Sequence, residues 1–179
     1  MKRKEFIKRS AIGLSVSLIA PSAFASTSSE SKISKMAAKV IRSAEGKKVN
    51  VIGDNMTFKL TGEDTGGQFS LMQEYNEPGV GVPLHVHEHE DEIFKVLEGE
   101  IEMEVGDTKT VLRAGDIGFG PRGVPHAWRV VGTQKARVDL SIFPAGLENM
   151  FMELGQLPAG PPDFAKVTEI CGRYGVRFV

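Results

Sequence analysis

Between residues 49 and 143 the sequence repeatedly alternates apolar and polar residues, and this period of two constrains the fold more than any other feature. The clearest stretch, residues 100–105, reads Glu-Ile-Glu-Met-Glu-Val, which is typical of a strand with one face in water. Gly106 and Asp107 then favour a turn into a returning strand. Phe69, Leu71 and Gln73 form another alternating set, and further strand-like stretches lie at residues 92–97, 116–119, 126–131 and 136–143. Such closely spaced strands, with 20 glycines and 9 prolines to make turns, predict a β-sandwich or barrel.

The organisation of the chain follows from its length and from the two segments that flank the strands. A chain of 179 residues can bury one sizeable core but is short for two ordinary domains. We expect the barrel over residues 46–145. Residues 26–45 would form a linker that contains a short helix over residues 33–43, where apolar residues such as Met36 and Val40 recur at helical spacing. Residues 146–179 carry two apolar stripes at helical spacing and predict a helical extension that ends in a strand. These helices would lie outside the barrel or at a contact between two copies, so a homodimer is a possible assembly.

The first 25 residues have the layout of an export signal peptide. Basic residues precede an apolar stretch over residues 11–20, and Ala23-Phe24-Ala25 fits a cleavage site. The apolar stretch is too short to span a membrane. The alternative to a signal peptide is an ordinary amphipathic N-terminal helix. The opening Arg3-Lys4-Glu5-Phe6-Ile7-Lys8 resembles a twin-arginine signal with lysine as the second basic residue, so the general secretory route stays open. We expect an exported protein, periplasmic or secreted.

The charge of the remaining chain excludes one class of partner. Removal of residues 1–25 leaves 17 basic and 22 acidic residues, and no basic stripe remains, so nucleic acid is not expected to bind. No membrane span is expected after removal of the signal. The single cysteine, Cys171, cannot form a disulfide within the chain and predicts a buried core thiol.

All four histidines of the chain fall within one short window, which indicates a metal site. His85 and His87 lie two residues apart, so a strand directs both imidazoles to one face. His126 opens a later predicted strand, and Glu92 adds a carboxylate close to the first pair. Neutral imidazole is the commonest protein ligand for transition metals. The acidic residues around His89 favour a turn there, which places His89 at the rim rather than among the ligands.

The spacing of these residues resembles two motifs of the cupin superfamily. Five anchors match the first motif, namely Gly79, His85, His87, Glu92 and Gly99. Four match the second, namely Gly115, Pro121, Gly123 and His126, whereas Val130 stands where an asparagine is usual. The closer likeness is to small quercetin-dioxygenase-like cupins, through residues 60–67, 91–94 and 144–148.

This resemblance implies an all-β jelly-roll barrel (a double-stranded β-helix) with short flanking helices at both ends. It implies one divalent transition metal, Fe, Mn, Ni, Cu or Zn, held by His85, His87, Glu92 and His126. Asp91 is a competitor for the carboxylate position, although the six residues between Glu92 and Gly99 favour Glu92.

The resemblance further implies a dioxygenase that acts on a small enolic or phenolic, flavonol-like substrate, with Glu92 as the catalytic base. The alternatives are a non-redox isomerase or binder of sugars or small acids, and a barrel without catalysis. Four apolar residues would line an organic pocket or simply pack in the core: Phe69, Met103, Phe119 and Trp128. Arg122 would either meet an anionic substrate or remain a solvated turn residue.

Overall fold

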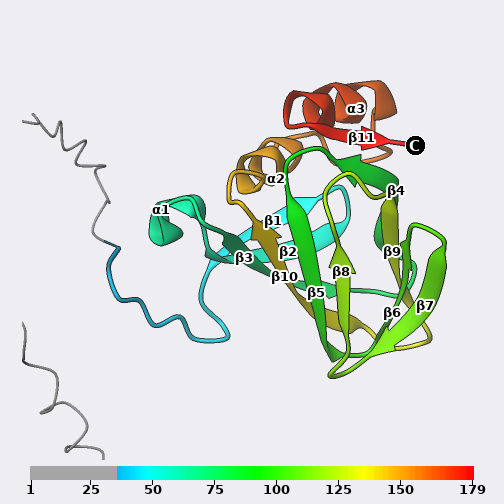
Figure 1. The fold of residues 1–179 in the computed structure, drawn as a ribbon, viewed down its shortest axis with the longest axis horizontal. Helices are drawn as coiled ribbons and strands as arrows, with labels where there is room; N and C mark the ends of the chain where they lie inside the picture. Colours follow the sequence, from blue (N-terminus) through cyan, green and yellow to red (C-terminus); the bar gives the residue numbers. More distant parts are fainter. Residues whose placement is uncertain (1–35) are drawn as a thin grey trace, which may run out of the picture. The chain divides into compact units, whose positions relative to one another are not determined.

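Two antiparallel sheets face each other in the computed structural model, which describes residues 36–179 (Figure 1). The six-stranded sheet has the order β1-β2-β3-β10-β5-β8, and the five-stranded sheet has the order β11-β4-β9-β6-β7. The first sheet comprises β1 (Lys47–Val51), β2 (Asp54–Leu60), β3 (Ser70–Asn76), β10 (Ala136–Phe143), β5 (Asp91–Glu98) and β8 (Ile117–Gly120). The second comprises β11 (Val176–Phe178), β4 (Gly81–His87), β9 (His126–Val131), β6 (Glu100–Val105) and β7 (Thr108–Arg113). The predicted all-β jelly roll is confirmed.

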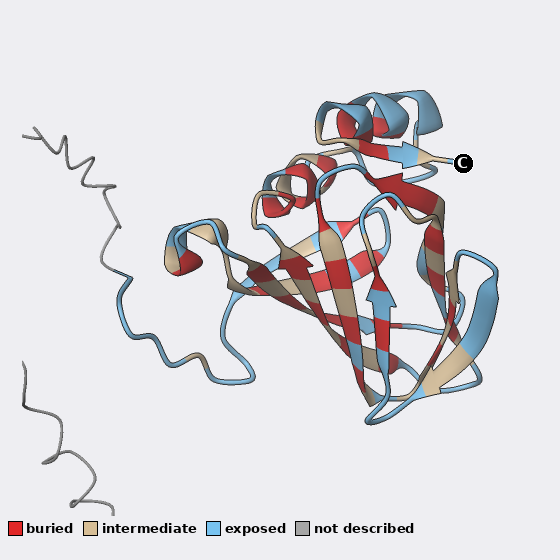
Figure 2. Cartoon of the chain, in the orientation of Figure 1, coloured by how far each residue is buried: buried red, intermediate tan, exposed pale blue. Residues whose placement is uncertain are grey.

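Alternating strand residues build the core between the two sheets, as the banded colouring of the strands in Figure 2 shows. In β10 every second residue, from Ala136 to Ile142, is buried. In β6, Ile101 and Met103 point inward while the glutamates between them stay partly exposed. Each fully buried side chain of this size contributes roughly 1.5 to 3 kcal/mol to folding, so the alternation selects one face of every strand.

The parity of β3 differs from the prediction. The sequence suggested Phe69, Leu71 and Gln73 as one alternating set, but β3 buries the intervening residues Ser70, Met72, Glu74 and Asn76. Three of these buried side chains are polar, so hydrophobicity alone points to the wrong face. Phe69 instead stacks on Phe143, with ring centroids 5.6 Å apart.

The turn between β5 and β6 needs a glycine at its centre. Gly99 has a φ of 72°, a left-handed conformation that side chains rarely adopt. A Cβ atom at this position would lie only 2.4 Å from the carbonyl oxygen of Lys135. The turn leads from β5 in one sheet to β6 in the other. The backbone at Lys135 passes so close to it that only glycine fits at position 99.

The helix predicted over residues 33–43 is wrong for the part that the structure describes. Residues 36–43 form no helix, and residues 33–35 lie outside the described part of the chain. Met36 and Val40, two of the residues at helical spacing, are 51% and 87% exposed. A short helix without a buried apolar face is not stable in water, which explains the difference. The signal peptide predicted for residues 1–25 also lies outside the described residues.

The predicted C-terminal helices and final strand are confirmed. After the single-turn helix α1 (Gly62–Thr65), residues 36–179 contain two longer helices, α2 (Glu148–Leu154) and α3 (Phe164–Arg173). Asp163 caps α3 by accepting hydrogen bonds from the backbone N–H groups of Ala165 and Lys166. Both helices turn apolar residues toward the sheets, and the buried Cys171 lies on the inner face of α3. Among the described helices, none combines the length and apolar character needed to cross a membrane.

The final strand β11 joins the barrel rather than lying on its surface. It pairs with β4 so that Val176 lies opposite His87 and Phe178 lies opposite His85. In Figure 1 the red β11 runs beside β4 at the end of the barrel near α2 and α3. The C-terminal extension therefore covers the end of the barrel that carries the histidines.

Candidate metal centre

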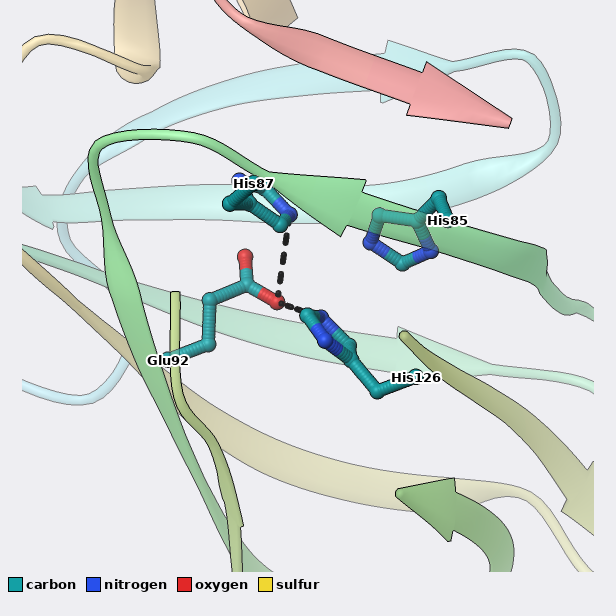
Figure 3. A group of neighbouring side chains, drawn as sticks. All are labelled: His85, His87, Glu92 and His126. Carbon is teal, nitrogen blue, oxygen red and sulfur yellow. Dashed lines mark hydrogen bonds and ion pairs between the residues drawn. The ribbon is translucent and has the colours of Figure 1, made fainter. Parts of the chain in front are cut away.

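Strands from both sheets bring together four of the residues predicted from the sequence. His85 and His87 come from β4, Glu92 from β5 and His126 from β9, and the four side chains point toward one another in Figure 3. One potential ligand atom of each lies within 4.8 Å of those of the other three. All four residues are buried, with exposures of 4% or less. The register of β4 against β9 sets His85 opposite His126, which explains why residues 41 positions apart in sequence meet.

Backbone hydrogen bonds orient two of the imidazoles. The Nδ1 of His85 lies 2.9 Å from the carbonyl oxygen of Pro83, and the Nδ1 of His126 lies 3.1 Å from that of Val124. A carbonyl oxygen only accepts, so each Nδ1 carries the proton and donates it. In a neutral ring the other nitrogen, Nε2, then presents a lone pair. This is the arrangement by which proteins fix histidine ligands for a metal.

The group of side chains needs a positive charge at its centre. The Nε2 of His126 lies 3.1 Å from the Oε2 of Glu92, and the Nε2 of His87 lies 3.7 Å from the same oxygen. With the tautomer fixed by Val124, the neutral His126 and the carboxylate would present two acceptors to each other, which repel unless a proton or cation lies between them. Neither ring nitrogen of the buried His87 has a hydrogen-bond partner among the described residues. Three nitrogens and one oxygen in this state fit a divalent transition ion.

The environment of the group favours the ligating forms of Glu92 and His85, whereas the nearby carboxylates favour a positive charge on His87. Burial alone would raise the pKa of Glu92, but the neighbouring His126, His87 and His85 outweigh it and lower that pKa. Burial lowers the pKa of His85 to about 4, which keeps this ring neutral at physiological pH. Burial also lowers the pKa of His87, but Glu90 and Glu92 reverse the effect and the net pKa is raised. The Nδ1 of His87 lies 3.6 Å from Glu90, too far for a hydrogen bond, so Glu90 acts there through its charge.

A glycine on β8 makes room for the ring of His126. A Cβ atom on Gly120 would lie 3.1 Å from three atoms of the imidazole. Glu92 pairs with Gly120 across β5 and β8, so the carboxylate and the missing side chain face the same point. Gly120 therefore lets His126 approach the six-stranded sheet closely enough to meet Glu92.

Three residues considered from the sequence, Asp91, Arg122 and His89, lie outside the group. Asp91 turns away from the cluster and forms an ion pair with Arg122, whose Nη2 lies 2.8 Å from its Oδ2. Asp91 also accepts hydrogen bonds from the side chain and the backbone N–H of Arg122, and these lower its pKa to about 2. Glu92 is therefore the carboxylate of the group, and Arg122 is engaged on the outside of the barrel. His89 has a side chain that is 66% exposed, at the rim as expected.

The group opens on a cavity of about 440 Å³ that the C-terminal helices cover. His85, His87 and Glu92 line one part of it, and Trp128, Leu140 and side chains from α2, α3 and β11 line the rest. Of the four apolar residues predicted for the pocket, Trp128 lines this cavity. Met103 packs in the core, whereas Phe69 and Phe119 lie elsewhere, and Phe119 is 53% exposed. Phe119 is exposed because strand residues alternate between the two faces, and its neighbours Gly118 and Gly120 take the inward positions of β8.

Two buried carboxyl groups that the sequence analysis missed also line this cavity, Asp54 on β2 and Glu74 on β3. Asp54 accepts a hydrogen bond of 2.6 Å from the Nδ2 of Asn76. Burial raises the pKa of Asp54 to about 6, against the opposing effect of Asn76, and burial raises the pKa of Glu74 well above its usual value. The signal for both was an acidic residue at an inward position of an alternating strand.

We predict that Asp54 makes folding less favourable as the pH rises. Its folded-state pKa of about 6 exceeds the unfolded value of 3.8, so the folded protein binds more protons between these two values. Stability is therefore lost as the pH rises through this window. Asp54→Asn keeps the acceptor for Asn76 and removes the ionisation.

The difference in unfolding free energy between Asp54→Asn and wild type should grow in favour of the variant by up to about 3 kcal/mol as the pH rises from about 4 to 7. Urea unfolding at each pH measures this difference. The matched control is Asp107→Asn at an exposed turn, which should show no such trend. Equal pH dependence in Asp54→Asn and wild type would contradict the prediction.

Comparisons with known proteins agree with this geometry. Residues 72–143 match the cupin domain family. A stretch of 91 residues is 31% identical to quercetin 2,3-dioxygenase of Bacillus subtilis and covers 51% of this chain, but only 27% of that enzyme. The chain thus spans about a quarter of the length of this relative.

Solved structures share the fold. KdgF from Halomonas sp. has a TM-score of 0.55 at 19% identity, over 63% of this chain and 99% of that one. A predicted oxalate decarboxylase from Thermotoga maritima has a TM-score of 0.54 at 26% identity, over 59% of this chain and 99% of that one. By the family match and the relative from Bacillus subtilis the chain is similar to cupins of the quercetin-dioxygenase-like type, and the two solved structures share its fold.

Proposed function

We propose that this protein is a metal-dependent dioxygenase that acts on a small enolic or phenolic compound of flavonol type. One observation carries the proposal: three imidazoles and one carboxylate converge at the wall of a largely apolar cavity. Such a cavity suits a small organic molecule, and a ligand set of four leaves positions open on an ion that accepts five or six. The similarity to a quercetin 2,3-dioxygenase over half of the chain supports the same reaction.

The residues around the cavity would have three roles: metal binding, proton transfer and exclusion of water. His85, His87, Glu92 and His126 would hold the ion, which when bound lowers the pKa of a substrate hydroxyl and stabilises the negative charge that develops on it. Glu92 would accept the proton of that hydroxyl, because its lowered pKa keeps it in the basic form. Trp128 and the apolar residues of α2 and α3 would exclude water from the substrate. Both atoms of dioxygen would enter the organic product.

Metal analysis combined with oxygen uptake tests this function. The purified full-length protein should contain about one equivalent of iron, manganese, nickel or copper and should consume oxygen when a flavonol is added. Glu92→Gln should reduce the turnover rate by at least about 100-fold, because the proton acceptor is removed. The ratio of oxygen consumed to flavonol lost, measured with an oxygen electrode and by absorbance, should be one to one.

Two results would contradict the proposal. Stoichiometric zinc without oxygen uptake would favour the non-redox isomerase or binding protein instead. A metal-free protein under saturating divalent salts would favour a barrel without metal chemistry. The metal-loaded His89→Ala variant should behave as wild type, since this side chain is exposed at the rim.

We further propose that the protein is exported and that two copies form a homodimer. The first follows from the signal-like residues 1–25, and the second from the additional helices after residue 146. N-terminal sequencing of the mature protein, expected to begin at Ser26, tests the export signal. Light scattering of that material tests the dimer.

A further inference from the structure

A buried carboxyl group in the cavity has no partner to explain it. Glu74 is 2% exposed, and neither of its carboxyl oxygens has a hydrogen-bond partner among the described residues. The chain handles another buried glutamate differently, since Glu148 accepts backbone hydrogen bonds from Gly62 and Gly146, each 2.7 Å long. An unpartnered buried carboxyl group destabilises a folded protein. A methionine like Met72, two residues earlier on the same face of β3, would avoid this cost.

The position of Glu74 places it away from the metal ligands. On β10, Val138 pairs with Glu74 and Ile142 pairs with Glu92. The two register positions differ by four residues, which at roughly 3.3 Å per residue corresponds to about 13 Å along the strand. Yet both residues line the same cavity, together with Asp54. A ligand of two or three rings that reaches the metal centre with one end can therefore present its other end to Glu74.

The charges of the cavity restrict what can occupy it. Its charged side chains, among the described residues, are the carboxyl groups Asp54, Glu74 and Glu92, and neither lysine nor arginine lines it. A ligand with a carboxylate at its far end would meet like charge without a compensating cation. A hydroxyl group can donate to a carboxylate or accept from a protonated carboxyl, and burial raises the pKa of Glu74 so that the protonated form is available.

We propose that Glu74, together with Asp54, forms a specificity-determining subsite that hydrogen-bonds a hydroxyl group on the end of the ligand remote from the metal centre. The cavity therefore selects neutral hydroxylated aromatic compounds over compounds that carry a carboxylate at that end. This inference rests on the proposed function, because it concerns the substrate of the same cavity. Asn76 holds Asp54 in place through its hydrogen bond of 2.6 Å and leaves Glu74 free to meet the ligand.

Binding of two matched ligands tests the subsite. The first is a flavonol whose one hydroxyl is the enolic group, and the second carries an additional phenolic hydroxyl on the far ring. Trp128 is the single tryptophan and lines the cavity, so its fluorescence quenching reports binding to the metal-loaded full-length protein. Wild type should bind the second ligand roughly tenfold more tightly. Glu74→Met should abolish this preference, so that the two ligands bind with similar affinity.

Two further variants separate recognition from folding. Glu74→Gln keeps the size and the hydrogen-bonding capacity, so it should retain part of the preference. Met72→Leu, at the preceding inward position of β3, preserves volume and should keep the full preference. Glu74→Met should also raise the melting temperature, because it removes an unpartnered buried carboxyl; a purely structural glutamate would give the opposite shift.

The outcomes distinguish this inference from the proposed function. If wild type consumes oxygen with the first ligand but shows no preference for the second, only the inference is wrong. The same holds if Glu74→Met keeps the tenfold preference. If wild type binds neither flavonol and consumes no oxygen with either, the proposed function is wrong and the subsite with it.

Discussion

Replacement of His126 by alanine should weaken metal binding by at least about 100-fold, since loss even of an outer partner of a ligand costs 10- to 100-fold. His126 is fully buried, and its Nε2 faces Glu92 at 3.1 Å while its Nδ1 donates to Val124. Without this ring, two imidazoles and one carboxylate remain, and water must complete the coordination. Titration with a chromophoric chelator that competes for the ion would measure the affinity of wild type and variant.

A neighbouring histidine provides the matched control for this variant. His89 belongs to the same sequence window but has an exposed side chain, so His89→Ala should retain the wild-type affinity. Circular dichroism should show an intact β fold in both variants, because the strand hydrogen bonds of β9 do not involve the ring. Full metal affinity in a folded His126→Ala variant would contradict the ligand assignment.

Replacement of Phe94 by alanine should cost about 3 to 5 kcal/mol of unfolding free energy, the largest effect on stability that we predict. Phe94 has no exposed surface and lies on β5, between β10 and β8. Its ring contacts Trp128 at a centroid distance of 6.3 Å and the edge of His126 at 6.5 Å. The variant leaves a void between the sheets that the surrounding backbone cannot close. Urea denaturation monitored by circular dichroism would give the difference.

Phe119 is the control for the loss of a phenylalanine. It lies on β8, next to β5, but its ring is 53% exposed, so Phe119→Ala should change the stability by only about 0.5 kcal/mol. The Phe94 variant should also bind metal more weakly, because His126 loses the ring against which it packs. A smaller loss of stability for Phe94→Ala than for Phe119→Ala would contradict the assignment of the core.

The metal centre was the most predictable part of the molecule. Three of the four histidines of the chain belong to it, and short spacings such as that of His85 and His87 translate directly into one face of a strand. The strands with strict alternation were equally accessible, and β9 and β10 begin and end at the predicted residues. In both cases the local pattern and the tertiary environment select the same face.

The remaining differences arise where the interior is polar or empty. Glu74 faces the cavity although hydrophobicity assigns its neighbours to the core, and Gly118 and Gly120 face inward without any apolar side chain to indicate it. A helix over residues 33–43 had suitable spacing but no partner surface to bury it. Sequence periodicity indicates which apolar residues are buried. It does not identify inward positions that are occupied by polar residues or glycines, which line cavities or allow close contacts.

The lone thiol of the chain can report on the packing of α3. Cys171 is buried, lines the cavity, and has a pKa that burial raises to about 11, so it is inert while the helix stays packed. We expect alkylation of this one sulfur to be slow while α3 stays packed. The alkylation rate of the folded protein would therefore report how often α3 leaves its packed position.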